Sequence, residues 1–286
     1  MLMNGKQLVE LTQKAKKEGW AIGAFNFVDY DTVEMILDAA EETKTPVIVQ
    51  SKDWDGTDVM TREKTMALYR YVCDKAAHAS VPVAIHLDHC PTYGGCARAI
   101  QYGASSVMID ASMKPFEDNV SITQKVRELC DETMTCLEAE IGHVTGHANS
   151  TGAVYTDVDS AVRFYNETKV DMLAVSIGTV HGVYTSAPVL NYERIKELNA
   201  AIPAALVMHG SSGLTVEQYH DTVKNGIVKI NFATYLQTTA AAAVKEYIEK
   251  ETGTLRNNNI VVAAHDAGVE YLKAHIGYFG TKSVTL

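Results

Sequence analysis

Residues 81–89 read Val-Pro-Val-Ala-Ile-His-Leu-Asp-His and combine the two features that recur throughout this chain. The first half is a short, almost continuous apolar run, which is typical of a strand buried on both faces of a parallel sheet. The second half ends in a carboxylate, Asp88, followed directly by an imidazole, His89. In a parallel barrel the carboxyl ends of the strands form the mouth that holds the reactive groups. The stretch therefore predicts an acid–base group and a metal ligand side by side at such a mouth.

Seven other short runs rich in apolar and β-branched residues are spaced along the chain, and helical periodicity fills the segments between them. Eight strand-then-helix units predict an α/β fold, namely a (β/α)8 TIM barrel in a single domain over residues 1–286. A doubly wound sheet is the weaker alternative, because no Gly-x-Gly-x-x-Gly follows the first strand. The expected strands are 21–25, 46–50, 81–87, 105–109, 135–138, 172–176, 205–208 and 227–231.

Helical segments are expected before the first strand and after each of the eight strands. Asn4 and Gln7 have the spacing of a capping box at the start of the first helix. The alanine-rich segment 238–252 is followed by Gly253, a residue type that commonly ends a helix. The other expected helices are 31–43, 61–79, 93–102, 119–132, 159–167, 192–200, 215–225 and 266–276.

The composition of the chain excludes several classes of function. The 286 residues carry a net charge of −10 and contain no basic run, so we expect no nucleic-acid partner. No apolar run approaches the roughly 18 residues of a membrane span, so we expect no membrane partner either. The five cysteines form no Cys-x-x-Cys pair, and their odd number favours reduced thiols in a cytoplasmic protein.

Two further histidines occupy the same kind of position as His89. His181 lies a few residues past the sixth expected strand, and His209 directly follows the seventh. Because the strand ends of a barrel converge on one face, we expect the three imidazoles to meet. Three protein ligands and one free position are what an open catalytic zinc site requires.

Other polar residues fall at the ends of the remaining strands. Any one of them could be an ordinary loop residue or a satisfied polar group, but their convergence at eight strand ends favours a shared site. Asn26 follows the first expected strand, Ser51 the second and Asp110 the fourth. Glu138 and Glu140 lie at the end of the fifth strand, and Asn231 ends the eighth.

Two segments are suited to binding phosphate. His209-Gly-Ser-Ser-Gly213 follows the seventh strand, and Asn231-Phe-Ala-Thr234 follows the eighth and opens a helix. Loops at these two places commonly hold phosphate in barrels through backbone N–H groups and a helix N-terminus. A Gly-Ser-Ser-Gly sequence alone is also compatible with a flexible turn, so the position of the motif carries the prediction. We expect contacts from Gly210, Ser211, Ser212, Ala233 and Thr234.

The segment 142–155, after the fifth strand, contains three glycines and few apolar residues, which is typical of a mobile lid. It contains His143 and His147. These are either solvated loop residues or acid–base groups that arrive when the lid closes.

Taken together, eight motifs resemble the class II, zinc-dependent ketose-bisphosphate aldolases, which include the fructose- and tagatose-1,6-bisphosphate enzymes. The resemblance covers nearly the whole chain, and both order and spacing agree. The motifs are Ala24-Phe-Asn26, His86-Leu-Asp-His89, Ser106-Val-Met-Ile-Asp110, Glu138-Ala-Glu-Ile-Gly142, Tyr155-Thr-Asp157, Ile177-Gly-Thr-Val-His-Gly182, His209-Gly-Ser-Ser-Gly213 and Lys229-Ile-Asn-Phe-Ala-Thr234.

The resemblance implies a role for each matching residue. It implies that His89, His181 and His209 hold catalytic zinc, with Asp110 and Glu140 in the surrounding shell, and that Asp88 is the acid–base group acting on the C4 hydroxyl. It implies dihydroxyacetone phosphate binding, a monovalent cation (Na⁺ or K⁺) near the phosphate, and a homodimer or homotetramer. The implied phosphate-binding residues are Gly182, Gly210, Ser212, Asn231 and Thr234, and Asn231 could also help to hold the enediolate.

The chain departs from the family pattern in three places. Ala148 stands where the family lid usually carries a glutamate that moves the proton at C3, and our hypothesis is that His147 or His143 took over this step. After the second strand, Ser51 is followed by the bulky Lys52 and Trp54, which could reshape the aldehyde end or lie in a surface loop.

The third departure is near the C-terminus, where the family has an arginine-rich segment that contacts the distal phosphate. Arg256 is the only arginine of that region here. The aldehyde half is therefore glyceraldehyde 3-phosphate, a differently charged analogue or a neutral aldehyde. Ala233 stands where fructose-bisphosphate enzymes often carry aspartate, and tagatose-type enzymes resemble this chain there.

The sequence thus predicts zinc-dependent, reversible aldol cleavage of a small phosphorylated sugar, a ketose 1-phosphate or 1,6-bisphosphate of the fructose or tagatose type or a variant. The products are dihydroxyacetone phosphate and an aldehyde. Two alternatives remain at this point. One is a zinc hydrolase on the same barrel with a metal-activated water. The other is a non-catalytic, aldolase-like subunit.

Overall fold

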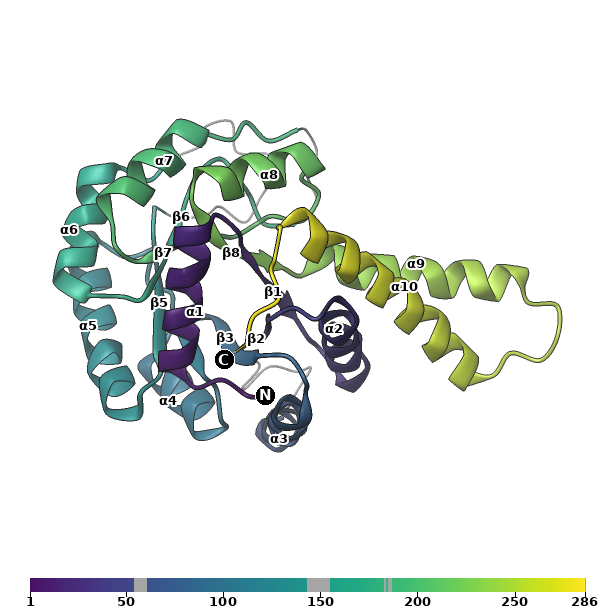
Figure 1. Cartoon of the computed structure of the whole chain (residues 1–286). Helices are drawn as coiled ribbons and strands as arrows, with labels where there is room; N and C mark the ends of the chain where they lie inside the picture. The colour runs from purple at the N-terminus through teal and green to yellow at the C-terminus, as the bar shows by residue number, and fades with distance from the viewer. Residues whose placement is uncertain (54–60, 143–154, 183, 185–186, 286) are drawn as a thin grey trace.

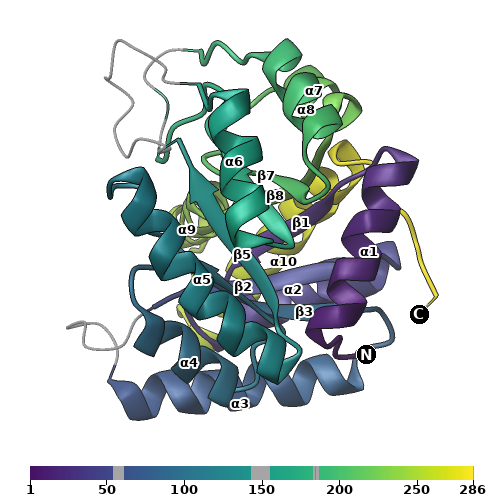
Figure 2. The same cartoon turned by 90° about the vertical axis from the view of Figure 1, so that its left-hand side faces the viewer.

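The computed structural model describes the chain except residues 54–60, 143–154, 183, 185–186 and 286. Within the described residues, parallel strands form one closed barrel in sequence order, with β8 paired to β1 (Figures 1 and 2). The (β/α)8 fold is confirmed. The strands are β1 (Ile22–Asn26), β2 (Val47–Lys52), β3 (Val83–Cys90), β4 (Ser106–Ile109), β5 (Cys136–Ile141), β6 (Met172–Val175), β7 (Ala205–Met208) and β8 (Ile227–Phe232).

Helices surround the barrel, and α1 closes its amino-terminal end (Figure 2). The expected capping box of α1 is present, since the Asn4 side chain accepts from the Gln7 backbone and the Gln7 side chain accepts from the Asn4 backbone. The helices are α1 (Gly5–Glu18), α2 (Tyr30–Thr43), α3 (Arg62–His78), α4 (Tyr93–Gln101), α5 (Phe116–Thr133), α6 (Val158–Thr168), α7 (Tyr192–Ala201), α8 (Val216–Asn225), α9 (Thr234–Lys250) and α10 (Asn257–Tyr278).

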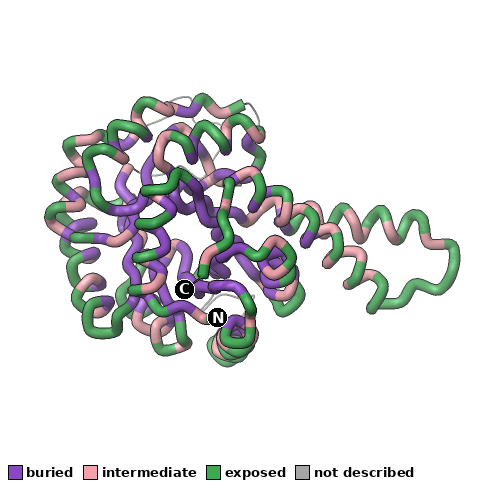
Figure 3. The backbone as a smooth tube through the Cα atoms, viewed as in Figure 1, coloured by how far each residue is buried: buried purple, intermediate pink, exposed green. Residues whose placement is uncertain are grey.

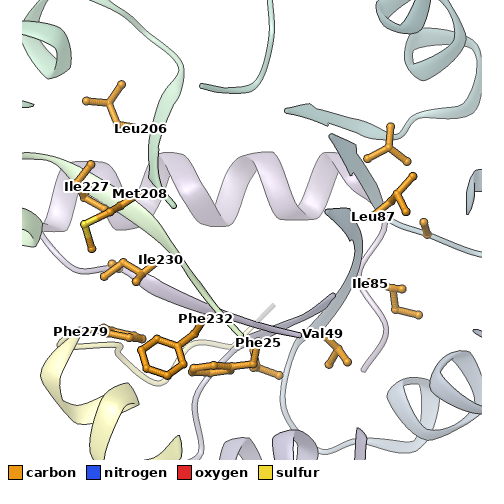
Figure 4. Packing of buried hydrophobic residues seen from close by; sticks show 14 of the residues in the cluster. Phe25, Val49, Ile85, Leu87, Leu206, Met208, Ile227, Ile230, Phe232 and Phe279 are labelled. Carbon is orange, nitrogen blue, oxygen red and sulfur yellow. The ribbon is translucent and has the colours of Figure 1, made fainter. Parts of the chain in front are cut away.

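Two apolar clusters hold the barrel together. The larger one lies between the strands and the helices, and Figure 4 shows Phe25, Phe232 and Phe279 packed together within it. The smaller one fills the amino-terminal half of the barrel interior, where Leu8 and Leu11 of α1 pack against strand residues. Apolar side chains thus seal one end of the barrel. The polar side chains of the cavity described below lie at the other end.

The last two helices form an arm that projects from the barrel (Figure 1). The sequence predicted helices 238–252 and 266–276, but α9 begins at Thr234 and α10 begins at Asn257. The second boundary was wrong because the asparagines at 257–259 have low helix propensity and look like a loop. In the structure α10 packs against α9 and α2, with its buried residues in the second half of the helix and its first three residues exposed.

The outer part of the arm is largely open to solvent (Figure 3). It carries exposed apolar side chains, among them Ile248, Leu255 and Val262. Within the described residues, no helix is long and apolar enough to cross a membrane.

Candidate active site

A cavity of about 290 Å³ opens at the carboxyl ends of the barrel strands. It gathers most of the residues that the sequence predicted, although they come from six different strands or the loops after them. The residues lining it are Asn26, Lys52, Asp88, His89, His181, Gly182, His209, Gly210, Ser211, Ser212, Asn231, Phe232, Ala233 and Thr234.

Three imidazoles meet on one side of this cavity. Ring centroids are 4.5 Å apart for His89 and His209, 5.0 Å for His89 and His181, and 5.9 Å for His181 and His209. One ring nitrogen from each lies within 4.8 Å of the others. The backbone of His89 has a φ of 47° at a point where the β3–β4 register shifts, which turns the imidazole toward the mouth. The three side chains could together hold one metal ion.

Carboxylates lie behind two of these rings. Nδ1 of His89 is 2.7 Å from Oδ2 of Asp110, and Nε2 of His209 is 2.9 Å from Oε1 of Glu138. Each carboxylate leaves the other ring nitrogen facing the shared point, and Nε2 of His89 is 2.8 Å from Nδ1 of His209. Carboxylates behind metal-binding imidazoles fix the tautomer and increase ligand basicity. The donor set therefore suits a divalent cation such as zinc, which prefers nitrogen ligands of this kind.

A second group of possible ligands overlaps the first. His89, Asp110 and Glu140 also bring one donor atom each within 4.8 Å of one another. Glu140 is fully buried on β5, so its carboxylate comes from the wall of the barrel. The sequence prediction that Asp110 and Glu140 lie close to the metal ligands agrees with this arrangement.

Asp88 is the buried carboxylate of the cavity. Its Oδ2 accepts a hydrogen bond from Asn26 Nδ2 at 2.9 Å, and its Oδ1 accepts one from Asn231 Nδ2 at 2.9 Å. Burial alone would raise the pKa of Asp88, but its charged neighbours, His89 foremost, hold that pKa well below the usual range. The group is therefore ionised near neutral pH and can accept a proton.

The imidazoles respond differently to the same surroundings. Burial lowers the pKa of His209 well below its usual value, and the neighbouring His89 adds to this effect. For His89, burial acts in the same direction, but the carboxylates of Asp88 and Asp110 outweigh it and raise the pKa to about 9. A bound cation would have to displace a proton from His89, and none from His209.

The loops after β7 and β8 line the same cavity. Gly210 has a φ of 63°, and a Cβ there would meet the Val180 carbonyl oxygen at 2.4 Å, so only glycine fits. The Tyr184 hydroxyl donates to the Gly210 carbonyl oxygen at 2.7 Å and steadies this loop. Helix α9 begins at Thr234 without a side-chain cap, so its first N–H groups face the cavity end of the helix. Such N–H groups bind anions.

Two predicted site residues lie away from this cavity. The Ser51 hydroxyl is fully buried and lies 3.0 Å from the Tyr69 hydroxyl, beneath the cavity wall. Arg256 precedes α10 at the outer end of the arm. His147 and His143 fall in the segment 143–154, outside the described residues, so their expected role stays a prediction.

Three buried polar residues were not assigned a role from the sequence, and a fourth, Glu138, was expected at the shared site without a specific role. Gln50 donates to Asn26, and Lys229, Glu138 and His86 lie inside the barrel below the histidines. A lysine or glutamate in the middle of an otherwise apolar strand is the signal that could have found them, because such residues are almost never fully buried without a partner.

A barrel that gathers three histidines and an ionised carboxylate at the carboxyl ends of its strands has the arrangement found in TIM-barrel enzymes. A sequence model of the family described as fructose-bisphosphate aldolase class-II matches residues 6–283. The chain therefore belongs to the class-II fructose-bisphosphate aldolase family and is a lyase of the aldol-cleaving type. This membership favours aldol cleavage over the hydrolase alternative.

Solved structures agree with the fold. The chain is similar to the YdjI aldolase from Escherichia coli K12, with 32% sequence identity, a TM-score of 0.86 and coverage of 98% of each chain. It also resembles fructose-bisphosphate aldolase (Fba) from Campylobacter jejuni, with 24% identity, a TM-score of 0.85 and coverage of 99% of this chain and 97% of that one. The second likeness is one of fold.

Proposed function

We propose that this protein is a zinc-dependent aldolase that reversibly cleaves a ketose 1-phosphate or ketose 1,6-bisphosphate to dihydroxyacetone phosphate and an aldehyde. The observation that carries the proposal is that Asp88 lines one cavity together with two different features. The histidine cluster lies beside it, and the phosphate-type loops after β7 and β8 line the same cavity. Family membership supports the aldol class of the reaction.

His89, His181 and His209 are the residues that would hold the metal, and Asp110 and Glu140 would support it. When bound, zinc supplies a Lewis acid that stabilises negative charge on substrate oxygens. Three histidines leave one position for substrate, as catalytic zinc sites require.

Asp88 would take the proton of the substrate C4 hydroxyl. As that proton leaves, the C4–O bond becomes the carbonyl of the aldehyde, the C3–C4 bond breaks, and its electron pair stays on C3. Proton transfer by a positioned group contributes roughly 10²- to 10⁴-fold in rate. Asn26 and Asn231 hold the carboxylate from both sides, so only its open face is left for substrate. The proton that C3 then receives would come from His147 or His143.

The phosphate of the dihydroxyacetone half would be bound by the loops that follow β6, β7 and β8. The groups that would bind it are the backbone N–H groups of Gly182, Gly210 and Ser211, the Ser212 hydroxyl, and the first turn of α9 at Ala233 and Thr234. A monovalent cation, Na⁺ or K⁺, would lie beside the phosphate and offset part of its charge.

The aldehyde half would extend toward β2. Lys52 lines the cavity at this end, and its backbone pairs in register with Asp88. Its ammonium group suits an aldehyde that carries a negative terminal group, of which glyceraldehyde 3-phosphate is one. Ser51 and Arg256 would contribute less directly, since neither lines the cavity of its own chain.

We also propose that the protein forms a homodimer or homotetramer in the cytoplasm. The exposed apolar residues Ile248, Leu255 and Val262 on the projecting arm support association, because burying them would stabilise a complex. The five cysteines are free thiols, which supports a reducing compartment. Sedimentation velocity at micromolar concentration tests the oligomer, and a monomer would contradict it.

The function is tested by an enzyme-coupled assay for dihydroxyacetone phosphate with a panel of ketose 1-phosphates and 1,6-bisphosphates. Release of the triose phosphate, its loss in chelator and its return with zinc would support the proposal. Cleavage that ignores chelation would contradict the metal, and no release from any member of the panel would contradict the substrate class.

A further inference from the structure

A lysine and a glutamate face each other inside the barrel, beneath the histidine cluster. Lys229 on β8 and Glu138 on β5 are both fully buried, and Nζ of the lysine is 2.9 Å from Oε2 of the glutamate. Replacing such a pair by apolar residues is often neutral or even stabilising, because removing two charges from water costs so much. Stability alone therefore gives a weak reason for the pair, and its other contacts suggest a second role.

Lys229 is connected to Asp88, the proposed general base, through the side-chain amide of Asn231. Nζ of Lys229 donates to Oδ1 of Asn231 at 2.6 Å, and Nδ2 of Asn231 donates to Oδ1 of Asp88 at 2.9 Å. An ammonium group has donors only, so it can face only the oxygen of the amide. The amino group of Asn231 is thereby turned toward Asp88. Without the lysine, the Asn231 oxygen would lose its donor, and the orientation of the amide would depend on Asp88 alone.

Glu138 contacts one of the proposed metal ligands, the imidazole of His209. Oε1 of Glu138 is 2.9 Å from Nε2 of His209, and a carboxylate accepts a hydrogen bond there only if that nitrogen carries the proton. The other nitrogen, Nδ1, is then free of hydrogen and points toward His89. The tautomer of a metal-binding histidine is set in this way by the partner behind it.

We propose that Lys229 and Glu138 are positioning residues for this active site. The two ends of one ion pair would set separate parts of the machinery, namely the orientation of Asn231 against Asp88 and the tautomer of His209. The part of the inference that concerns Asn231 and Asp88 rests on the proposed function. The half that concerns His209 and zinc does not depend on which sugar is cleaved.

Two double variants separate positioning from simple charge balance. Lys229→Met with Glu138→Gln removes both charges but keeps an oxygen that can accept from His209. Lys229→Met with Glu138→Met removes both charges and that acceptor as well. Neither variant leaves an unpaired buried ion, and urea unfolding checks that both are folded.

Zinc affinity, measured by competition with a chromophoric chelator, tests the role of Glu138 in setting the tautomer of His209. We expect the Met/Gln variant to keep the parent affinity within about threefold and the Met/Met variant to bind zinc about 10- to 100-fold more weakly. The rate of fructose or tagatose 1,6-bisphosphate cleavage tests the role of Lys229 in orienting Asn231. Both variants should lose about 10- to 100-fold in kcat with little change in KM, because a misplaced amide affects the transition state more than binding.

Parent values of zinc affinity and kcat in both variants would show that the pair only balances charge, and would overturn the inference. A second measurement needs no variant. Nitrogen-15 NMR of histidine-labelled, zinc-loaded protein should show His209 protonated at Nε2, and protonation at Nδ1 would refute the role of Glu138. If the parent protein cleaves no sugar of the panel, the proposed function fails while the zinc and NMR results still decide the His209 half.

Discussion

Nδ1 of His89 lies 2.7 Å from Oδ2 of Asp110, so this imidazole presents only its Nε2 to His209. In the protein without metal, the same contact favours a proton on His89. The carboxylates of Asp88 and Asp110 outweigh the effect of burial and raise the pKa of His89 to about 9. The geometry that suits a cation therefore also suits a proton, and the two compete for one nitrogen.

This competition predicts how the stability of the metal-free protein depends on pH. The folded pKa of His89 lies above the unfolded value of about 6.5, so its contribution is complete below pH 6.5 and is lost as pH rises through about 9. Urea unfolding should give a lower free energy of unfolding at pH 9.5 than at pH 7. The loss is a few kcal/mol at most, since one pKa unit corresponds to about 1.4 kcal/mol.

The control is His89→Gln. Burial also raises the pKa of thiols such as Cys136, which titrate at about 8.5 in the unfolded chain, so only the difference between parent and variant isolates His89. A parent and variant that lose the same stability between pH 7 and 9.5 would show that the His89 proton is not held by the folded structure.

Replacement of the buried carboxylate, Asp88→Asn, is expected to reduce cleavage about 10²- to 10⁴-fold and to leave a bound metal in place. The reason is that an amide cannot take the C4 hydroxyl proton. Steady-state kinetics and metal content measured by mass spectrometry check the two parts separately. The matched control is Asp74→Asn, an exposed carboxylate on α3, which should behave as the parent does. Parent kcat in Asp88→Asn would exclude this group as the base.

The tight conformation of the loop after β7 predicts that substitution of Gly210 weakens binding of the substrate phosphate. Gly210→Ala would place a Cβ 2.4 Å from the Val180 carbonyl oxygen, next to His181, and the backbone would have to move. We expect a large rise in KM for a ketose 1-phosphate and weaker metal binding. Gly280→Ala is the control, because its φ of 62° is nearly the same but a Cβ there meets nothing within 4 Å. Equal kinetic effects at both positions would assign the change to backbone strain alone.

The position of Lys52 in the cavity predicts that its ammonium group binds the charged end of the aldehyde half. Lys52→Met should raise KM for ketose 1,6-bisphosphates about 10- to 100-fold, because hydrogen bonds to charged groups contribute roughly 1.5–3 kcal/mol. Ketose 1-phosphates with a neutral far end should be affected much less. The ratio of kcat/KM for the two substrate types measures the effect. An unchanged ratio would show that Lys52 does not contact the distal group.

Much of this architecture follows from local sequence. The eight apolar runs and the polar residues at their ends predicted the barrel, and His89, His181 and His209 converge as their positions required. The reason is that barrel geometry carries every strand end to the same face. The capping box of Asn4 and Gln7 is equally local, since both partners lie within one helical turn.

What could not be predicted depends on contacts between distant segments. The ion pair of Lys229 and Glu138 joins residues 91 positions apart, and no local pattern indicates which buried charge faces which. The packing of α10 on α2 likewise joins segments that lie far apart in the sequence. Ser51 lies one residue before the end of β2, but its hydroxyl lies close to that of Tyr69, a partner that only the packing of α3 reveals.

The most direct measurement is anomalous X-ray scattering on crystals of the protein purified with zinc, recorded on both sides of the zinc edge. We expect a single strong peak within bonding distance of the free ring nitrogens of His89, His181 and His209. After chelation the peak should disappear, and the protein should no longer release dihydroxyacetone phosphate from its substrate. A peak elsewhere, or full cleavage activity in crystals and solutions that hold no metal at these three rings, would contradict the proposed role of the histidine cluster.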